Sequence, residues 1–360
     1  MKILFSEGEW YYRDLGLNDV DRYAFSFDGM RYYNKSDRFL YQYDLFVCSY
    51  YTMPHNVILT RRFHALGVKT ILCSDGIFDF ANSFKNPMHL KYGLTSFHPI
   101  LQDVFLCVGK NEANYFNDKA ITMDFMPKRL ISRKVPCPIP EDKRVLLTTA
   151  NTAYFNNQEY DVLLGLIIDI GTLLIEGSID FSFRIFDKKL LASLNKEFGL
   201  DISNDIDEGF EDTLQRYSSV ITTPSSIAVV SMFHRRSTAL LIYRDWPMLL
   251  QTGWMVPSAK IFGIHLSDFL MRSESRMEVQ DKFLDGYLTK NGMTERVLEA
   301  AQVEFKSVKE RESLIIKSYE NMLLSKFNFN FEFFIRKLYK RLRSFKILSS
   351  ILNRIKKSVF

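Results

Sequence analysis

The feature that most constrains the fold of this chain is a repeated alternation between short apolar runs and segments with helical spacing. The segment 55–67 is one of the helical ones, with Leu59, Phe63 and Leu66 on one face and Gly67 at its end. Continuous apolar strands that alternate with helices are typical of a parallel sheet covered on both faces. The sequence therefore predicts an α/β fold. The apolar runs interpreted as strands here are MKILF at 1–5, YDLFVCS at 43–49, TILC at 70–73 and VFLC at 104–107.

A second series of the same kind begins after residues 126–144, where four prolines and many charges give a linker composition. Two domains are expected for a chain of 360 residues, because domains usually have roughly 100–200 residues. We predict two Rossmann-like domains facing a cleft. The predicted divisions are an N-terminal domain at 1–135, a C-terminal domain at 145–270, a helical crossover at 271–325 and a basic tail at 326–360.

The basic character of the chain belongs to the tail. Residues 326–360 hold ten Lys or Arg and one acid, so the net charge of this tail is +9. Because the net charge of the whole chain is +5, the rest of the chain has a net charge of −4. Apolar residues recur there at helical spacing, with basic residues between them, which predicts an amphipathic helix on an anionic membrane surface. A dimerisation helix or a groove-docked helix would show the same pattern. Because the charge is confined to the tail, we expect no nucleic acid partner.

The cysteines and the hydropathy indicate the cellular compartment in which the protein is expected. Cys48, Cys73, Cys107 and Cys137 form no CxxC pair, and three of them end apolar runs, which predicts buried free thiols in a reducing environment. No apolar stretch reaches the 18 residues of a membrane span, and the N-terminal apolar run is too short for a signal peptide. We therefore expect a cytoplasmic protein that is peripheral on the inner face of the cytoplasmic membrane.

The strongest local motif is ITTPSSIAVVSM at 221–232. A strand ends at Thr222 and Thr223, the chain turns at Pro224, and a helix begins around Ser225 and Ser226. Hydroxyl side chains at a helix N-terminus either cap the helix or, with the free N–H groups, bind an anion such as a nucleotide phosphate. Both interpretations stay open at this point.

The second motif is CSDGIFDF at 73–80, an acid at the end of a strand. Ligands of α/β proteins bind at the carboxyl ends of parallel strands. Asp75 is therefore a candidate general base for an acceptor hydroxyl, with Asp79 as a weaker candidate. An ordinary Asp–Gly turn is the alternative interpretation.

Softer candidates follow other strands. Thr149 and Asn151, with Thr148 and Thr152, end the first strand of the second domain and form a possible hydroxyl cradle for a nucleotide. Arg184 flanks another strand end, where it either contacts phosphate or belongs to a solvated surface. Plain turns or structural roles are equally consistent with the remaining candidates, which are Ser6, Glu7, Gly8, Lys188, Arg244, Asp245 and His98.

Several familiar motifs are missing. The sequence has no GxGxxG after the first strand, no Walker loop, no HExxH and no GxSxG. Its two DxD strings, Asp19 with Asp21 and Asp205 with Asp207, do not follow clear apolar strands. We therefore predict no bound metal and no resident cofactor.

Together these segments resemble glycosyltransferases of the GT-B fold, in organisation over the whole chain and in motif only in patches. SDG at 74–76 resembles the acidic-Gly motif of bacterial sialyltransferases, and PSS at 224–226 resembles their serine motif. The resemblance implies that Asp75 is the base and that Ser225 and Ser226 bind the donor phosphate, which in that family belongs to a CMP-linked sugar. It also implies an inverting, metal-independent enzyme of bacterial surface-polysaccharide synthesis, with a nucleotide-sugar donor and a glycan or glycolipid acceptor.

The chain departs from the sialyltransferase pattern in two places. The expected His-Pro slot reads FRIFDKK, with Phe186 and Asp187, and Ser74 replaces the first acid of the pair. These departures leave other functions open for the same fold. One is a non-catalytic, membrane-associated assembly protein, and the others are a polyol-phosphate transferase and a nucleotide-sugar epimerase.

Overall fold

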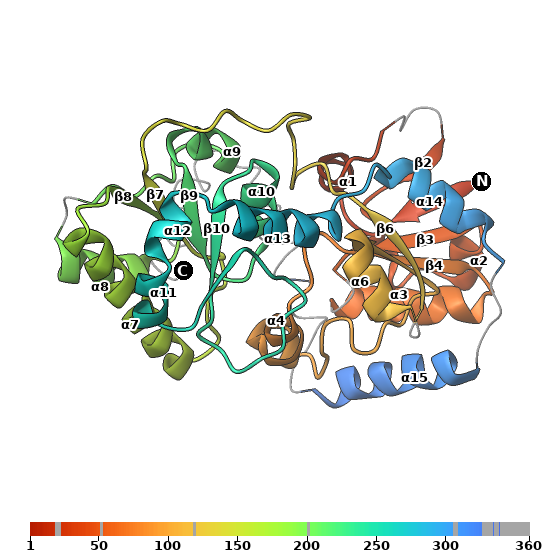
Figure 1. Cartoon of the computed structure of the whole chain (residues 1–360). Coiled ribbons are helices and arrows are strands. Elements are labelled where there is room, and N and C mark those ends of the chain that lie inside the picture. The colour runs from red at the N-terminus through yellow and green to blue at the C-terminus, as the bar shows by residue number, and fades with distance from the viewer. Residues whose placement is uncertain are drawn as a thin grey trace.

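The computed structural model describes residues 1–18, 23–50, 53–117, 120–199, 202–304 and 309–325, together with Phe334 and Leu338. Asp19, Asp21 and the rest of the predicted tail at 326–360 lie outside the described residues. Two α/β domains stand side by side, each built on one parallel sheet (Figure 1). This confirms the predicted fold class of two Rossmann-like domains.

The N-terminal sheet has six parallel strands in the order β2-β1-β3-β4-β5-β6. The chain adds β2 on one side of β1 and then returns to add β3 on the other side. The carboxyl ends of β1 and β3 therefore form the switch point of the sheet, where such folds bind ligands. The strands are β1 (Lys2–Phe5), β2 (Ala24–Ser26), β3 (Leu45–Cys48), β4 (Lys69–Cys73), β5 (Val104–Val108) and β6 (Ile121–Phe125).

Each face of this sheet packs on an apolar layer, because successive side chains along a strand point to opposite faces. One layer contains Phe46 and Leu72 with α3 and α15, and the other contains Val47 and Ile71 with α1 and α14. Cys48, Cys73 and Cys107 lie in these layers as free buried thiols, as predicted. The helices of this domain are α1 (Glu9–Leu15), η2 (Gly29–Tyr32), α2 (Asp37–Leu40), α3 (Pro54–Ala65), α4 (Phe80–Lys85), α5 (Pro87–Leu90) and α6 (Gly109–Phe116).

The C-terminal sheet has five parallel strands in the order β11-β10-β9-β7-β8. The long helix α7 packs its buried face, including Leu163 and Ile170, on this sheet, while α10 covers the other face near the first domain. The strands are β7 (Val145–Thr148), β8 (Phe181–Arg184), β9 (Ser219–Thr222), β10 (Ser237–Leu241) and β11 (Trp254–Val256). The helices are α7 (Asn157–Glu176), α8 (Lys188–Phe198), α9 (Phe210–Thr213), η3 (Leu214–Arg216), α10 (Ser226–Phe233), α11 (Ala259–Ile264) and α12 (Leu266–Leu270).

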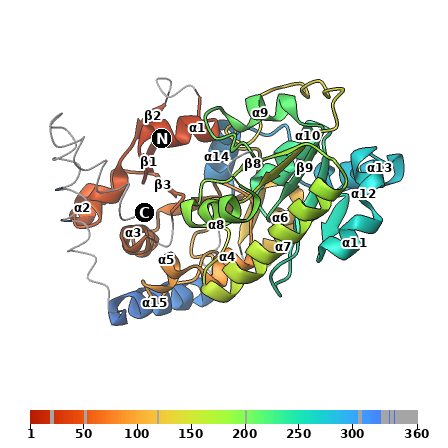
Figure 2. The same ribbon diagram turned by 90° about the vertical axis from the view of Figure 1, so that its left-hand side faces the viewer.

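The last helices carry the chain back to the first domain. They are α13 (Glu274–Asp285), α14 (Met293–Gln302) and α15 (Lys309–Leu324). Lys69 caps α14, because its Nζ donates to the carbonyl oxygens of Ala300 and Ala301 at 3.1 and 2.7 Å. In Figure 2, α15 lies along the edge of the first domain beside α3, and the two helices are in contact.

An apolar cluster joins the two domains. Val108, Leu130, Ala228 and Tyr287 pack together in it, from β5, the linker, α10 and the turn after α13 respectively. Gly109 permits this approach, because a Cβ there would lie 2.5 Å from the Cα of Tyr287 and its φ is +73°. The relative placement of the domains thus depends on close packing at the end of β5.

A polar contact ties the opposite side of the domain interface. Arg244, after β10, places its Nη1 3.5 Å from Asp79 Oδ2 of the first domain and its Nε 3.1 Å from Glu159 Oε2. The rings of Phe84 and Trp246 stack beside it with centroids 5.9 Å apart. The segment between β10 and β11 is therefore held against α4.

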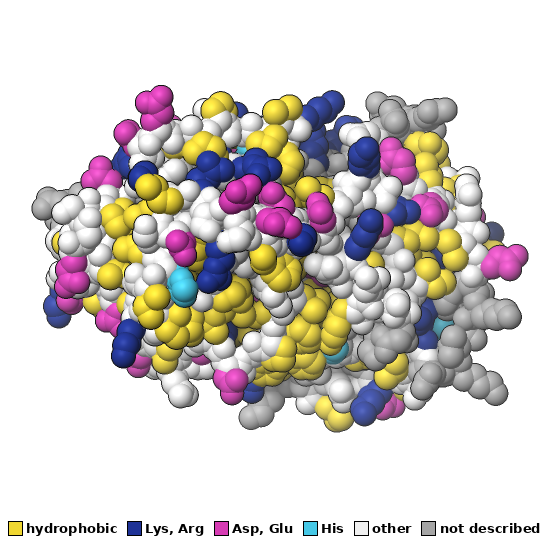
Figure 3. Space-filling view, viewed as in Figure 1, with side chains coloured by type: hydrophobic (Ala, Val, Ile, Leu, Met, Phe, Trp, Pro, Cys, Tyr) yellow, Lys and Arg dark blue, Asp and Glu magenta, His cyan; other side chains and the backbone are white. Residues whose placement is uncertain are grey.

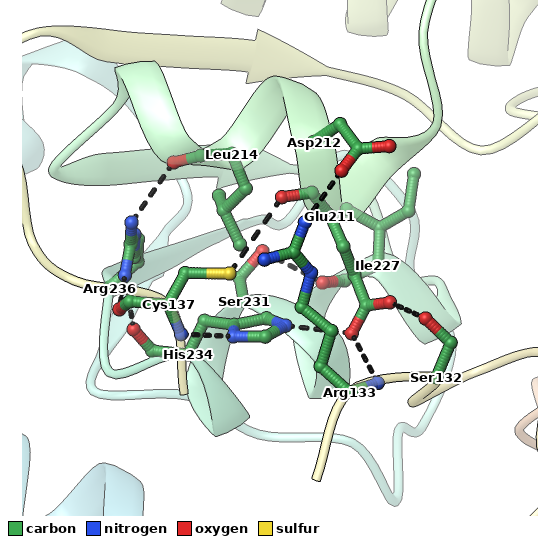
Figure 4. A network of polar contacts seen from close by, with 10 residues as sticks. All are labelled: Ser132, Arg133, Cys137, Glu211, Asp212, Leu214, Ile227, Ser231, His234 and Arg236. Atoms are coloured by element: carbon green, nitrogen blue, oxygen red, sulfur yellow. Dashed lines mark hydrogen bonds and ion pairs between the residues drawn. The ribbon is translucent and has the colours of Figure 1, made fainter. Parts of the chain in front are cut away.

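The buried guanidinium of Arg236 organises the linker. It donates to the backbone oxygens of Cys137, Pro138, Leu214, Tyr217 and His234, and part of this network is drawn in Figure 4. Burial without a carboxylate partner lowers the pKa of Arg236 to about 10. The linker is thus fastened to the second domain just before β7 begins.

The face of the molecule drawn in Figure 3 has a mixed surface. Lys, Arg, Asp and Glu side chains mingle over α13 and the nearby linker, and an apolar surface extends over α11 and the segment between β10 and β11. Ile264 on α11 is 72% exposed. This face therefore offers no continuous basic stripe of the kind that binds a nucleic acid backbone. Within the described part of the chain, no helix has both the length and the apolarity to span a membrane.

Candidate functional site

A cavity of about 450 Å³ opens between the linker and the second domain. Its volume is within the range of ligand pockets, roughly 300–1,000 Å³. The cavity joins the linker after β6 to α9 and to the first turns of α10. The lining residues are Arg129, Leu130, Ser132, Arg133, Gly209, Phe210, Glu211, Asp212, Ser226, Ile227 and Val230.

The N-terminus of α10 lies at this cavity. Ser225 is the N-cap residue, with extended backbone, yet its side chain makes no capping hydrogen bond. Its Oγ is buried and has no hydrogen-bond partner among the described residues. The ordinary capping role that the sequence left open for Ser225 is therefore not what the structure shows.

A second hydroxyl without a partner lies on the neighbouring strand. Thr149 follows β7, is buried, and its Oγ1 has no hydrogen-bond partner within the described part of the chain. Thr148 pairs with Thr222 in the β7–β9 ladder, and Ala150 N donates to Thr223 Oγ1 at 2.7 Å. The ends of β7 and β9 are thus locked together, and they place both hydroxyls at one edge of the sheet.

Unpaired buried hydroxyls need an explanation, because each costs roughly 1–3 kcal/mol. A helix N-terminus beside them adds free backbone N–H groups and a positive dipole end. Thr149 Oγ1, Ser225 Oγ and the first turn of α10 therefore form a candidate anion site.

Asp75 approaches from the first domain. Its Oδ2 lies 2.8 Å from Nη2 of Arg129, which also donates through Nε to the Asp75 carbonyl oxygen at 3.0 Å. The carboxylate is 38% exposed. Arg129 and Ser226 line the same cavity, so the arginine that pairs with Asp75 also faces the space beside α10.

Two tyrosines accompany Asp75. Burial and the nearby Asp75 carboxylate raise the pKa of Tyr11 and of Tyr50. The Tyr11 ring lies 5.1 Å from the Tyr50 ring and 5.8 Å from the Arg129 guanidinium carbon. The carboxyl edge of the first sheet thus presents rings, an acid and an arginine together.

Other predicted residues have structural contacts. Arg184 donates to the backbone oxygens of Asp205 and Glu208, so its guanidinium holds the loop after α8. Asn151 is exposed on the turn after β7. Asp79 is the N-cap of α4, accepting from Ala81 N at 3.1 Å, and also pairs with Arg244. Thr222 donates to the neighbouring Thr223 carbonyl oxygen.

The departure from the His-Pro slot has a clear structural consequence. Asp187 caps α8 by accepting from Leu190 N at 2.8 Å, and it also accepts from Tyr154 at 2.9 Å. Phe186 is half exposed and packs near Arg184, whose guanidinium carbon lies 5.2 Å from its ring centroid. The end of β8 therefore offers no imidazole to a ligand.

The linker supplies residues that the sequence interpretation did not select. Ser132 donates to Glu211, and Arg133 pairs with Asp212 at 2.6 Å (Figure 4). His234 accepts from Cys137 N through Nδ1 at 2.9 Å, so its Nε2–H donates to Glu211 at 2.8 Å. Only proximity in the fold joins these segments, and no sequence motif marks them.

Glu7 stands at the switch point between β1 and β3. It accepts from the hydroxyl of Tyr12, from Asn56 Nδ2 at 3.0 Å, and from the backbone of Ser49 and Tyr50 at 3.2 and 3.1 Å. Burial raises the pKa of Glu7, while these donors act in the opposite direction. Glu7 therefore fixes the loop that carries Tyr50. Across the residues described, no cluster of His, Cys, Asp and Glu could hold a metal ion.

Glu112 supports the loop that follows Asp75. The carboxyl group is fully buried and accepts from Phe78 N at 2.6 Å and from Val108 N at 3.1 Å. Burial raises the pKa of Glu112 to about 8, against the opposing effect of the two backbone donors. One acid thus links the end of β5 to the segment after Gly76.

Comparison with solved structures agrees with this architecture. The chain is similar to a protein from Listeria monocytogenes assigned as a UDP-N-acetylglucosamine 2-epimerase, with a TM-score of 0.54, 11% identity, and coverage of 83% of this chain and 95% of that one. At such low identity, the likeness shows a shared two-domain fold of the GT-B type.

Weaker likenesses reach two further structures. One is S. aureus MnaA with UDP, at a TM-score of 0.48, 13% identity, and coverage of 74% and 77% of the two chains. The other is the wall teichoic acid polymerase TagF with CDPG, at a TM-score of 0.43, 13% identity, and coverage of 90% of each chain. No protein-family model matches the chain, and no curated protein matches it significantly in sequence.

The raised pKa of Glu112 predicts a pH-dependent stability. Between its ordinary value of 4.5 and about 8, the folded state keeps a proton that the unfolded chain has lost. The free energy of unfolding should therefore fall as pH rises through this window, by at most about 1.4 kcal/mol per pH unit from this group. Urea unfolding at pH 5.5, 6.5 and 7.5 measures the slope.

The matched variant is Glu112→Gln, which keeps the shape of the side chain and cannot titrate. It should show a shallower fall over the same window, whatever its stability at a single pH. An equally steep fall in the variant would assign the pH dependence to other groups.

Proposed function

We propose that this protein is a glycosyltransferase that moves a sugar from a nucleotide-sugar donor to a glycan or glycolipid acceptor. The observation that carries the proposal is the pair of buried hydroxyls without partners, Thr149 Oγ1 and Ser225 Oγ, beside the N-terminus of α10. A donor phosphate would satisfy both hydroxyls and the free N–H groups of the helix together.

The cavity next to this site has room for the nucleoside part of a donor. Glu211 and Asp212 line the cavity, and carboxylates there can accept from ribose hydroxyls. Nucleotide-sugar use is also in the name of the Listeria protein that shares the fold. The serine motif at 224–226 favours a CMP-linked nonulosonate as the first donor to test.

In this proposal Asp75 acts as the general base. It removes the proton of an acceptor hydroxyl, whose oxygen then attacks the anomeric carbon of the donor sugar. The bond from that carbon to the phosphate oxygen breaks, and the phosphate leaves with the electron pair. The N-terminus of α10 stabilises the leaving phosphate, so the reaction inverts the anomeric carbon and uses no metal.

The acceptor would meet the carboxyl edge of the first sheet. Trp10 on α1 is 74% exposed and Tyr50 after β3 is 44% exposed. Exposed aromatic rings offer flat apolar area with a polar tip, which suits the faces of sugar rings. We propose a glycan acceptor from capsule, O-antigen or lipooligosaccharide synthesis at this edge.

A second candidate is a non-catalytic assembly protein of the same fold. The contacts at the end of β8 favour it, because Arg184 and Asp187 bind groups of their own domain there. A polyol-phosphate transferase would use the same phosphate site with a different transferred group. Nucleotide binding separates the assembly protein from both transferases.

Nucleotide binding at α10 is the first prediction of the proposed function. One of CMP, CDP, UMP, UDP, GDP and dTDP should raise the melting temperature of the wild type. Thr149→Val and Ser225→Ala should each weaken the binding of that nucleotide by roughly fivefold or more, since a hydrogen bond contributes about 1 kcal/mol or more. Ser203→Ala, whose hydroxyl donates to Ser182 away from the cavity, is the control. Failure of every nucleotide to stabilise the wild type would favour the assembly protein.

Catalysis by Asp75 is the second prediction. Asp75→Asn should lower the rate of sugar transfer by roughly 10²–10⁴-fold, because the amide cannot take the acceptor proton. Nucleotide affinity should not decrease. The assay measures transfer from the nucleotide-sugar chosen by the binding panel to cell-envelope glycolipid. A variant with wild-type transfer would remove Asp75 from the mechanism.

Membrane association through residues 326–360 is also a proposal, supported by the net charge of +9 in that segment. The full chain should sediment with vesicles that contain anionic phosphatidylglycerol and much less with neutral phosphatidylcholine vesicles. A chain ending at Ser325 should lose this binding and keep its nucleotide affinity. Equal binding to both vesicle types, or binding by the shortened chain, would contradict the proposal.

A further inference from the structure

Arg129 holds a position between the two halves of the proposed site. It belongs to the linker after β6, and its side chain reaches back to Asp75 at the carboxyl edge of the first sheet. It also lines the cavity whose far wall contains Ser226, the first residue of α10. One guanidinium therefore borders the proposed base and the proposed phosphate site.

The contacts of Arg129 leave part of the guanidinium available. Nε and Nη2 donate to the Asp75 carbonyl oxygen, and Nη2 also pairs with Oδ2 of the Asp75 side chain. Nη1 has no acceptor in the described part of the chain. The guanidinium fork matches phosphate geometry well, because it can donate two parallel hydrogen bonds.

The other charged groups of the cavity are already paired. Arg133 is bound to Asp212, and Glu211 accepts from Ser132, His234 and the Arg133 backbone. Only Arg129 has as its partner a carboxylate that the reaction itself requires. An anion that enters the cavity therefore meets Arg129 as the cation whose pairing can change.

We propose that Arg129 is a donor-phosphate ligand supplied by the linker, and that Asp75 and the donor phosphate compete for it. In the empty site Asp75 holds Arg129 by the side-chain pair. In the donor complex the phosphate takes over that pair, while the hydrogen bonds to the Asp75 carbonyl oxygen keep Arg129 in place. The Asp75 carboxylate is then free for the acceptor hydroxyl, so the base becomes available only when the donor is present. This inference rests on the proposed function.

The competition predicts opposite effects for two substitutions. Arg129→Gln should weaken nucleotide binding by roughly tenfold or more, since a charged hydrogen bond contributes about 1.5–3 kcal/mol. Asp75→Asn should strengthen binding of the same nucleotide, by about two- to tenfold, because the competing negative charge is removed. A purely structural pair would make both variants weaker binders or change neither.

Isothermal titration calorimetry tests this with whichever of CMP, CDP, UMP, UDP, GDP and dTDP stabilises the wild type and, as probes without phosphate, with the corresponding nucleosides. The nucleosides should bind wild type and Arg129→Gln alike. In the double variant Arg129→Gln/Asp75→Asn, the Asn substitution should no longer strengthen nucleotide binding. This non-additivity is expected if Asp75 acts on the nucleotide through Arg129. Arg216→Gln is the matched control, because Arg216 pairs with Asp205 and Glu208 outside the cavity.

The outcomes separate the inference from the function on which it rests. If wild type binds none of the six nucleotides, the donor site itself fails and Arg129 has no role in it. If wild type and Arg129→Gln bind a nucleotide with equal affinity, or if Asp75→Asn lowers that affinity, the donor site is supported but the inference about Arg129 is wrong. Should the Gln variant not fold, Arg129→Lys and Asp75→Asn decide the question, with Lys expected to bind more weakly than Arg and Asn more tightly than Asp.

Discussion

The apolar contact between the two domains is the constraint on which the site depends. Val108 at the end of β5 packs with Leu130 of the linker, Ala228 of α10 and Tyr287 after α13. Four distant parts of the chain meet there, and Gly109 leaves room for the backbone of Tyr287. This packing brings α10 and the linker, which carries Arg129, to the same cavity. Without this packing, the hydroxyls of Thr149 and Ser225 and the Asp75–Arg129 pair would lie on separate surfaces of the two domains.

The linker has a more active role than its composition suggests. It passes between the domains with Arg129 bound to Asp75 on one side, and with Ser132 and Arg133 bound to Glu211 and Asp212 on the other. Further along, Arg236 binds the carbonyl oxygens of Cys137 and Pro138. The prolines that mark this stretch as irregular also leave carbonyl groups free of secondary structure, and the buried arginine uses them.

Much of the fold was predictable from local pattern. The strand runs at 70–73 and 104–107 lie within β4 and β5, and the helical segment expected at 55–67 largely matches α3 at Pro54–Ala65. These elements have strong periodicity and their own apolar faces. The helix at Ser225 and Ser226 was also expected, since a Pro turn after a strand and two hydroxyl residues mark its start. The predicted tail lies outside the described residues apart from Phe334 and Leu338, so its helix remains a prediction.

The sequence by itself determined the elements, the two-domain division and the residue types at the strand ends, because these follow from periodicity and turn chemistry over short distances. Tertiary structure alone decided which of those residues have partners. Arg184 was a candidate phosphate ligand, yet its guanidinium binds the loop after α8. For Thr149 and Ser225 the sequence left both ligand binding and an ordinary turn or cap role open, and packing leaves their hydroxyls unpaired among the described residues. Arg129 carried no signal at all, since its contact with Asp75 spans 54 positions and exists only when β4 and the linker are brought together.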